Sequence, residues 1–240
     1  MKYALLINAP EATAGQALSS NPYRGLLARM RAEGSFRGAR RFAPAATMVR
    51  TRDAGPEVSE RGAAPGGETL AAFVIVECEA EEGATALAEE VAIATGAAVE
   101  VRPVAAQGEG GPEKAGVAER APAPGLSEYA FVINVAEEKR PWPGNPAFDE
   151  LMENCGKVLA KLEAAARFRG TERLAPASKA KTVRVADGRR SVTDGPFSEA
   201  RELIGGFILG ECKGRDEAVA LAGLIPGSMS GSVEVREVVE

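Results

Sequence analysis

The sequence contains no histidine among its 240 residues. Histidine is the side chain most often used as a general acid or base near neutral pH, so any mechanism that requires an imidazole is excluded. Cysteine is scarce as well: Cys78, Cys155 and Cys212 are the only three, and none lies in a C-x-x-C spacing. An odd number without that spacing argues against a disulfide framework or a zinc site, and no histidine is present to activate a thiol.

Long apolar runs and an excess of positive charge are also missing. No window approaches the ~18 apolar residues that a bilayer-spanning helix needs. The apolar run at residues 3–7 is shorter than the core of a signal peptide. We therefore expect a cytoplasmic protein without a membrane partner. The formal charge of −5 predicts no direct nucleic-acid partner, because phosphate binding requires clustered positive charge. No cofactor or metal is expected.

What the sequence does contain is an internal repeat. Residues 49–104 align with residues 183–238 at a constant offset of 134, without gaps, and 17 of the 56 positions are identical. The repeat predicts two modules, residues 1–104 and 127–240, joined by a Gly/Pro-rich linker at residues 105–126. The identical pairs include Val49/Val183, Arg50/Arg184, Phe73/Phe207, Cys78/Cys212, Leu87/Leu221 and Arg102/Arg236.

Each module is predicted to contain a strand, a helix, a strand, a strand pair, a strand, a helix and a final strand. Apolar residues at i, i+3, i+4 and i+7 predict an amphipathic helix at residues 21–32. The pairs Asn21-Pro22 and Asn145-Pro146 are typical of helix starts, with asparagine as the cap and proline in the first turn. Asp187-Gly188 predicts a hairpin turn.

The closing strands, residues 99–104 and 233–238, alternate apolar and charged residues. This pattern predicts one buried face and one face in water. The order of elements predicts an α+β fold in which an antiparallel sheet carries helices on one face. A single such sheet would leave its second face bare, so we expect the two modules to cover each other as an intramolecular pseudo-dimer.

The two modules differ at one loop. The second keeps the run Val192–Phe197, of sequence VTDGPF, where the first has Glu60-Arg61-Gly62-Ala63. Asp194 has two interpretations: a general base or ligand-binding carboxylate, or simple turn chemistry in which Asp, Gly and Pro each favour a bend. A structural turn should be needed in both copies, so the difference favours a one-sided site.

Five other residues complete the candidate ligand site. Gly195 and Pro196 belong to the same loop, and Phe197 is a candidate pocket wall. Arg184 becomes an anion-binding candidate if it points into a cleft near Asp194. The alternative for Arg184, as for Arg50, Arg102 and Arg236, is exposed cross-strand ion pairing. Trp142 is either a lid over the motif or a plug at the end of a helix.

The second module resembles the YCII-related superfamily, and specifically its DGPF branch. The residues that carry the resemblance are Tyr129–Ile133, Thr182–Val185, Asp194–Phe197, Glu199, Gly205–Phe207 and Gly231–Arg236. The resemblance implies ferredoxin-like (βαββαβ) modules that pair into a dimeric α+β barrel-like assembly. Relatives of the YCII type carry a His–Asp pair in a cleft, and this chain lacks the histidine. Many bacterial DGPF proteins are encoded beside extracytoplasmic-function sigma factors.

We therefore expect a protein that binds a small molecule or a partner protein through its second module, with the first as a scaffold. One alternative is an enzyme that uses Asp194 as an acid or base, with Arg184 positioning the substrate. A lone general base supplies typically 10²–10⁴-fold, so such an enzyme would need further stabilising groups. The other alternative is an accessory regulator of a sigma factor.

Overall fold

The computed structural model describes residues 1–52, 55–60, 67–106, 116–140, 143–198, 200–225 and 231–239. The first half contains β1 (Lys2–Pro10), α1 (Glu11–Leu18), α2 (Asn21–Ala32), β2 (Phe36–Arg52), β3 (Gly55–Glu60), β4 (Glu68–Glu77), α3 (Glu81–Thr95) and β5 (Ala98–Pro103). The short β6 (Gly116–Val117) follows. The second half contains β7 (Ser127–Ala136), α4 (Pro146–Ala164), β8 (Phe168–Arg173), β9 (Lys181–Ala186), β10 (Arg189–Asp194), β11 (Glu202–Cys212), α5 (Arg215–Ala222) and β12 (Ser232–Val239). Short 3-10 turns lie at Glu137–Lys139 and Ala177–Lys179.

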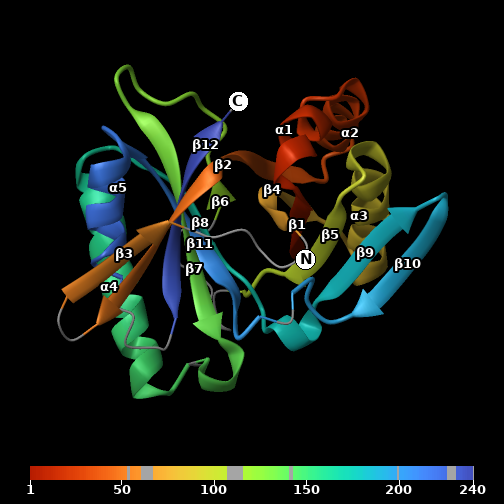
Figure 1. Cartoon of the computed structure of the whole chain (residues 1–240). Coiled ribbons are helices and arrows are strands. Elements are labelled where there is room, and N and C mark those ends of the chain that lie inside the picture. Colours follow the sequence, from red (N-terminus) through yellow and green to blue (C-terminus); the bar gives the residue numbers. More distant parts are fainter. Residues whose placement is uncertain are drawn as a thin grey trace.

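The described strands form one antiparallel sheet of 12 strands, in the order β10-β9-β5-β1-β4-β2-β12-β7-β11-β8-β6, with β3 paired to β2. The helices lie on two opposite flanks, α1, α2 and α3 on one and α4 and α5 on the other (Figure 1). The chain is thus an α+β protein, as predicted, and its arrangement is consistent with two ferredoxin-like modules forming a dimeric α+β barrel-like sheet.

Each half completes the sheet of the other. The hairpin β9–β10 belongs to the second half but pairs with β5, so that Val183 faces Val99. Conversely, the end of β2, in the first half, pairs with β12, so that Val49 faces Val233. At the repeat offset of 134 residues, Val99 corresponds to Val233 and Val49 corresponds to Val183, so the two strand pairings are equivalent. The two exchanges therefore have the same register.

Three apolar clusters hold this arrangement together. One lies between helices α1–α3 and the outer face of β1, β4 and β5. A second lies between α4, α5 and the outer face of β7, β11 and β12. The third lies on the inner face, where strands of both halves contribute to a single cluster. At its centre Phe73 and Phe207, two residues related by the repeat, stack with ring centroids 4.4 Å apart. This shared inner cluster is consistent with two modules that cover each other's second face.

The local predictions hold in most places. Helix α2 spans the predicted residues, and Asn145 caps α4 by accepting from the amide of Ala147 at 2.9 Å. The cap of α2, however, is Ser20, whose hydroxyl accepts from the amide of Tyr23, so the prediction of Asn21 as the cap was one residue late. Helix α1 was not predicted. Among the described residues, no helix combines the length and hydropathy that crossing a bilayer requires.

The described end of the predicted linker, residues 116–126, is built into the fold. Strand β6 pairs with β8, and the amide of Ala118 donates to the carbonyl of Arg169 at 2.7 Å. Gly170 is required here: its φ is +156°, and a Cβ would lie 2.3 Å from the carbonyl oxygen of Gly116. On the first half, Arg40 donates to the carbonyl of Ala118. This stretch therefore contacts both halves, while residues 107–115 lie outside the described part.

Candidate functional site

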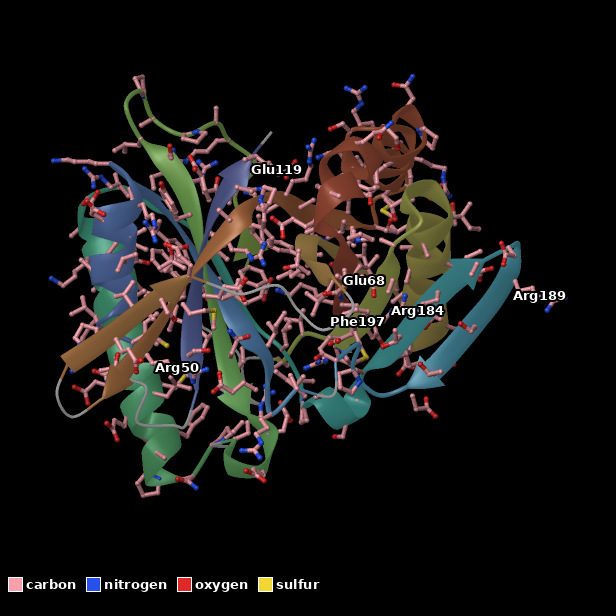
Figure 2. All side chains as sticks on the ribbon, in the orientation of Figure 1. Arg50, Glu68, Glu119, Arg184, Arg189 and Phe197 are labelled. Atoms are coloured by element: carbon pink, nitrogen blue, oxygen red, sulfur yellow. The ribbon has the colours of Figure 1, made fainter. Side chains whose placement is uncertain are left out.

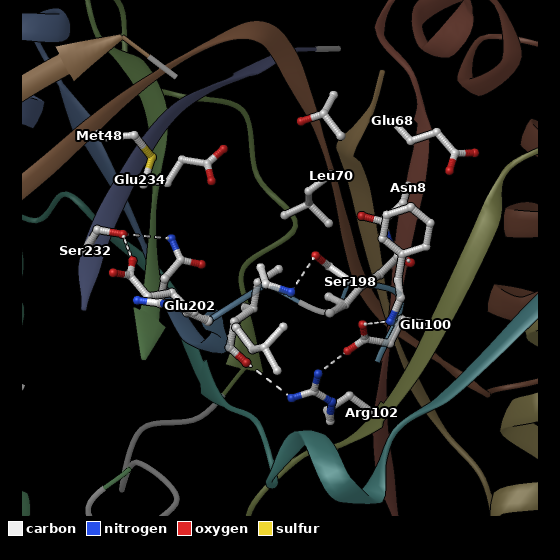
Figure 3. A pocket seen from close by; sticks show the side chains of 18 of the residues that line it. Asn8, Met48, Glu68, Leu70, Glu100, Arg102, Ser198, Glu202, Ser232 and Glu234 are labelled. Atoms are coloured by element: carbon white, nitrogen blue, oxygen red, sulfur yellow. Dashed lines mark hydrogen bonds and ion pairs between the residues drawn. The ribbon is translucent and has the colours of Figure 1, made fainter. Parts of the chain in front are cut away.

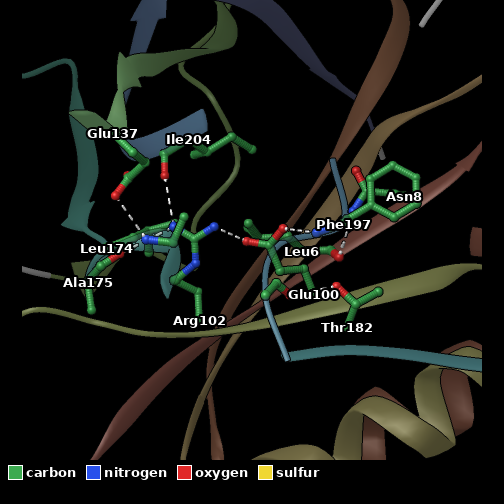
Figure 4. A network of polar contacts seen from close by, with 12 residues as sticks. Leu6, Asn8, Glu100, Arg102, Glu137, Leu174, Ala175, Thr182, Phe197 and Ile204 are labelled. Carbon is green, nitrogen blue, oxygen red and sulfur yellow. Dashed lines mark hydrogen bonds and ion pairs between the residues drawn. The ribbon is translucent and has the colours of Figure 1, made fainter. Parts of the chain in front are cut away.

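The segment after β10 turns inward and reaches the other half of the molecule. Gly195 has a φ of +105°, its amide donates to Ala180 at 2.8 Å, and its carbonyl accepts from the hydroxyl of Thr182 at 3.0 Å. Two residues later the amide of Phe197 donates to Oε2 of Glu100 at 2.8 Å. Because Glu100 lies on β5, the loop of the second half is held by the closing strand of the first half (Figure 4).

A cavity of about 900 Å³ lies beside this segment, between the two halves. This volume is within the range of small-molecule sites. Its walls mix apolar side chains such as Met48 and Leu70 with polar ones such as Asn8 and Ser232 (Figure 3). The loop of the second half contributes Phe197, Ser198, Ala200 and Arg201. Residues 61–66, which correspond to this segment at the repeat offset, lie outside the described residues.

Most of the charged residues of the lining belong to ion pairs that repeat across the two halves. Arg184 binds Glu68 with Nη2 2.9 Å from Oε2, and Arg50 binds Glu202 with Nη2 3.0 Å from Oε2. Each of these pairs joins one half to the other. The two pairs are also related by the repeat, because 50 + 134 = 184 and 68 + 134 = 202.

Two further pairs lie along the closing strands. Arg102 binds Glu100 and Arg236 binds Glu234, in each case two residues apart on the same strand. Both arginines are 1% exposed, and both glutamates are buried. The charged face of these strands therefore lies in the interior between the halves, and the prediction of a face in water, with exposed cross-strand pairs, was wrong. Each of these buried charges is compensated by an oppositely charged residue on the same strand.

Arg184 also contacts the loop motif. Its guanidinium carbon lies 5.1 Å from the centroid of the Phe197 ring, a cation–π arrangement, while its nitrogens bind Glu68. Glu68, Arg184 and Phe197 lie close together in Figure 2. Two of the sequence-predicted ligand residues, Arg184 and Phe197, thus line one cavity together. Gly195 and Pro196 are not part of the lining and shape the path of the loop.

Asp194 lies elsewhere. It ends β10, its side chain is 89% exposed, and it is absent from the lining of the cavity. Its Oδ1 accepts a hydrogen bond from Nζ of Lys181 at 2.9 Å, and this ammonium group lowers the pKa of the carboxyl below its ordinary value. A carboxylate with a lowered pKa is a weaker base, which is the opposite of the change that general-base catalysis requires. The prediction that Asp194 contributes to a ligand site is given no support by this position.

The lowered pKa of Asp194 makes a direct prediction. In the variant Lys181→Met we expect the pKa of Asp194 to return towards the ordinary range of aspartate, because the bonded ammonium is removed. In the wild type, a lowered folded pKa means that the pair stabilises the fold above the unfolded pKa and loses this contribution as the pH falls through the folded pKa. Carboxyl-carbon NMR titration of both proteins measures the change, and an unchanged pKa would contradict the assignment.

Trp142 and the cysteines add no functional group to the described lining of the cavity. Trp142 lies outside the described residues. Cys155 and Cys212 are buried, and burial raises the pKa of each thiol to about 12, so both stay protonated near neutral pH. Among the described residues, no three histidine, cysteine, aspartate or glutamate side chains are grouped so that they could hold a metal ion.

Sequence reasoning missed the glutamates of the site. Glu68 and Glu202 were not singled out, although they are identical at the repeat offset. The signal was available: an acidic residue retained in both copies, together with an arginine also retained in both copies, is a candidate pair. What the sequence does not contain is the hairpin exchange that brings Arg184 to Glu68 from the other half.

The fold and the cavity define an α+β protein with a ligand-sized space between two halves of one antiparallel sheet. Residues 128–240 match the YCII-related domain. An uncharacterized protein of Rhizobium meliloti (strain 1021) is 34% identical over 90 residues, which cover 37% of this chain and 73% of that protein. The chain therefore belongs to the YCII-related family.

Proposed function

We propose that this protein binds a small organic molecule in the cavity between its two halves. The observation that carries the proposal is the cavity itself: about 900 Å³, lined by both halves and by the loop that follows the DGPF sequence. Its volume is that of a small-molecule site, and its lining combines an apolar wall with many polar and charged groups that could orient a ligand. The second half supplies the loop, which supports the earlier expectation that the second module carries the site.

We infer further that the two halves are copies of one module and that the second belongs to the DGPF branch. The equal register of the two hairpin exchanges supports a common origin, as do the paired equivalents Arg50/Arg184 and Glu68/Glu202. The intact Asp194–Phe197 sequence in the second half supports the DGPF assignment. The first half would then be the scaffold that anchors the loop through Glu100.

Filling the cavity tests the binding proposal. In Ser198→Trp we expect an indole ring to occupy the space beside the loop and to abolish ligand-induced stabilisation. A ligand at about 100 times its Kd stabilises a protein by about 2.7 kcal/mol, which a thermal-shift screen of small organic acids, amines and neutral compounds detects. Ser191→Trp is the matched control, because Ser191 lies exposed on β10 outside the lining.

The control variant should respond to the same compounds as the wild type. If Ser198→Trp keeps the response, the compounds bind elsewhere and the cavity is not the site. If no compound stabilises the wild type, the proposal of a small-molecule site in this cavity is wrong.

The two other functional hypotheses remain predictions. The enzymatic one depends on Asp194, and its position on the hairpin surface, paired with Lys181, offers no neighbouring group in the cavity. The regulatory one predicts association with a sigma factor, which co-purification tests directly. The binding proposal is preferred because it alone uses the cavity and the loop together.

A further inference from the structure

Within the described part of the chain, every charged side chain that lines the cavity, except one, forms an ion pair with a residue of opposite charge. The lining contains five glutamates, and each of them has an arginine partner. Four of these pairs are described above, and the fifth joins Glu60 to Arg215 of α5. Of the four arginines in the lining, three belong to these pairs, and the fourth is Arg201.

Arg201 makes no ion pair or hydrogen bond within the described part of the chain. It lies on the loop side of the cavity, between Ala200 and the first residue of β11, Glu202. Glu202 is already bound in two-pronged fashion by Arg50, at 3.0 Å for one of the two contacts, and by the hydroxyl of Ser232 at 2.7 Å. The neighbouring carboxylate is therefore occupied, and the guanidinium of Arg201 is left with its five donors available to another molecule.

The repeat sets Arg201 apart from the paired residues. Arg50 corresponds to Arg184, Glu68 to Glu202, and the Glu100–Arg102 pair to the Glu234–Arg236 pair, so these charges occur on both sides of the cavity. At the position equivalent to Arg201 stands Gly67, since 67 + 134 = 201. All of these repeated charges bind each other, either across the two halves or along one closing strand. The charge that occurs once and binds none of the described groups is the one left for a ligand.

We propose that the cavity selects a small organic acid with a single negative charge, whose carboxylate is bound by Arg201. This inference rests on the proposed function and adds the class of ligand to it. A guanidinium binds a carboxylate through two parallel hydrogen bonds, which fixes the orientation of the acid as well as its charge. The body of the ligand lies against Phe197 and the aliphatic side chains of Leu70 and Ile204.

The same charge count disfavours other ligands. A second negative charge on the ligand would have no free cation opposite it among the described lining residues and would lie near five carboxylates. A cationic amine would have to displace an arginine from a glutamate, and the buried pairs Glu100–Arg102 and Glu234–Arg236 are costly to break. The unpaired positive charge of Arg201 therefore favours a ligand with one negative charge.

The experiment compares acids with their uncharged amides. Phenylacetate and hexanoate are titrated into the protein beside phenylacetamide and hexanamide, with affinities measured by calorimetry or ligand-observed NMR. We expect each acid to bind the wild type about 10–100-fold more tightly than its amide, the range for a charge-assisted contact. In Arg201→Gln this preference should fall to about threefold or less.

Arg189→Gln is the matched control. Arg189 lies exposed at the hairpin end of β10 (Figure 2) and is not among the residues that line the cavity, so this variant loses the same charge outside the cavity. It should keep the full preference for acids. Preference retained in Arg201→Gln, or lost equally in both variants, would overturn the assignment of Arg201.

The outcomes also separate this inference from the proposed function. If amides or other neutral compounds bind in the cavity, as judged by the Ser198→Trp variant, and acids do not, the binding function stands and the ligand class is wrong. If neither the acids, the amides nor the broader compound screen gives binding that Ser198→Trp removes, both are wrong.

Discussion

Replacing Phe207 by alanine is expected to lower the free energy of unfolding by about 3–5 kcal/mol, the range found when a buried phenylalanine is truncated. Phe207 is 3% exposed, and its ring stacks on Phe73, which is 1% exposed, at an interplanar angle of 22°. Phe73 also contacts Phe42 at a centroid distance of 5.9 Å. Because strands surround this cluster on the inner face, it is unable to collapse onto the space that the ring vacates.

Urea denaturation of wild type and variant measures this loss. Ile93→Ala is the control, because Ile93 is 64% exposed on α3 and should change stability by no more than about 0.5 kcal/mol. The double variant Phe73→Ala/Phe207→Ala should show a coupling of about 0.5–1.5 kcal/mol between the rings. A loss below about 1 kcal/mol for Phe207→Ala would show that this stack does not hold the halves together.

The second large effect is expected at the buried pair of the first closing strand. Arg102→Met should cost about 3–5 kcal/mol, because it leaves the carboxylate of Glu100 buried without its cation. Arg102 also donates to the carbonyls of Ala175 at 3.2 Å and Ile204 at 3.3 Å, and both acceptors would lose a donor. Figure 4 shows these contacts converging on the guanidinium.

A double variant separates the cost of the stranded charge from the cost of lost packing. In Glu100→Gln/Arg102→Met both charges of this pair are removed, and the glutamine carbonyl is still able to accept from the amide of Phe197. We expect it to recover at least half of the loss in chemical denaturation. Arg189→Met, on the exposed hairpin, should be within about 0.5 kcal/mol of the wild type. A double variant no more stable than Arg102→Met would contradict this explanation.

The sequence predicted the elements well where the signal is local. The turn Asp187-Gly188 is an example: both residues have positive φ, 52° and 71°, as a tight hairpin turn requires, and aspartate and glycine are among the residues that tolerate it. The amphipathic spacing of residues 21–32 likewise predicted α2 at its observed bounds. Such patterns depend on neighbours a few residues apart, so one sequence is enough.

The pairing between distant strands was not predictable in the same way. The alternation in residues 99–102 states that one face of β5 is apolar and the other charged, but it does not state what covers the charged face. That depends on the second half, whose strands and loop enclose Glu100 and Arg102. For the same reason Asp194 stood out in the sequence, yet its position at the end of a hairpin edge leaves it in solvent. Arg201 carried no motif, and only its unpaired position in the cavity singles it out.

The exchanged hairpins have a consequence for how the cavity can change. In an assembly of two identical chains, symmetry copies every substitution to both sides of a shared space. Here both sides are encoded once each, so residue 201 can be an arginine while residue 67 remains a glycine. Because β9–β10 and the end of β2 are shared between the halves, the duplicated framework stays interlocked while such differences accumulate. The two sides of the cavity can therefore carry different residues and contact one ligand differently, which is not possible in a symmetric dimer of identical chains.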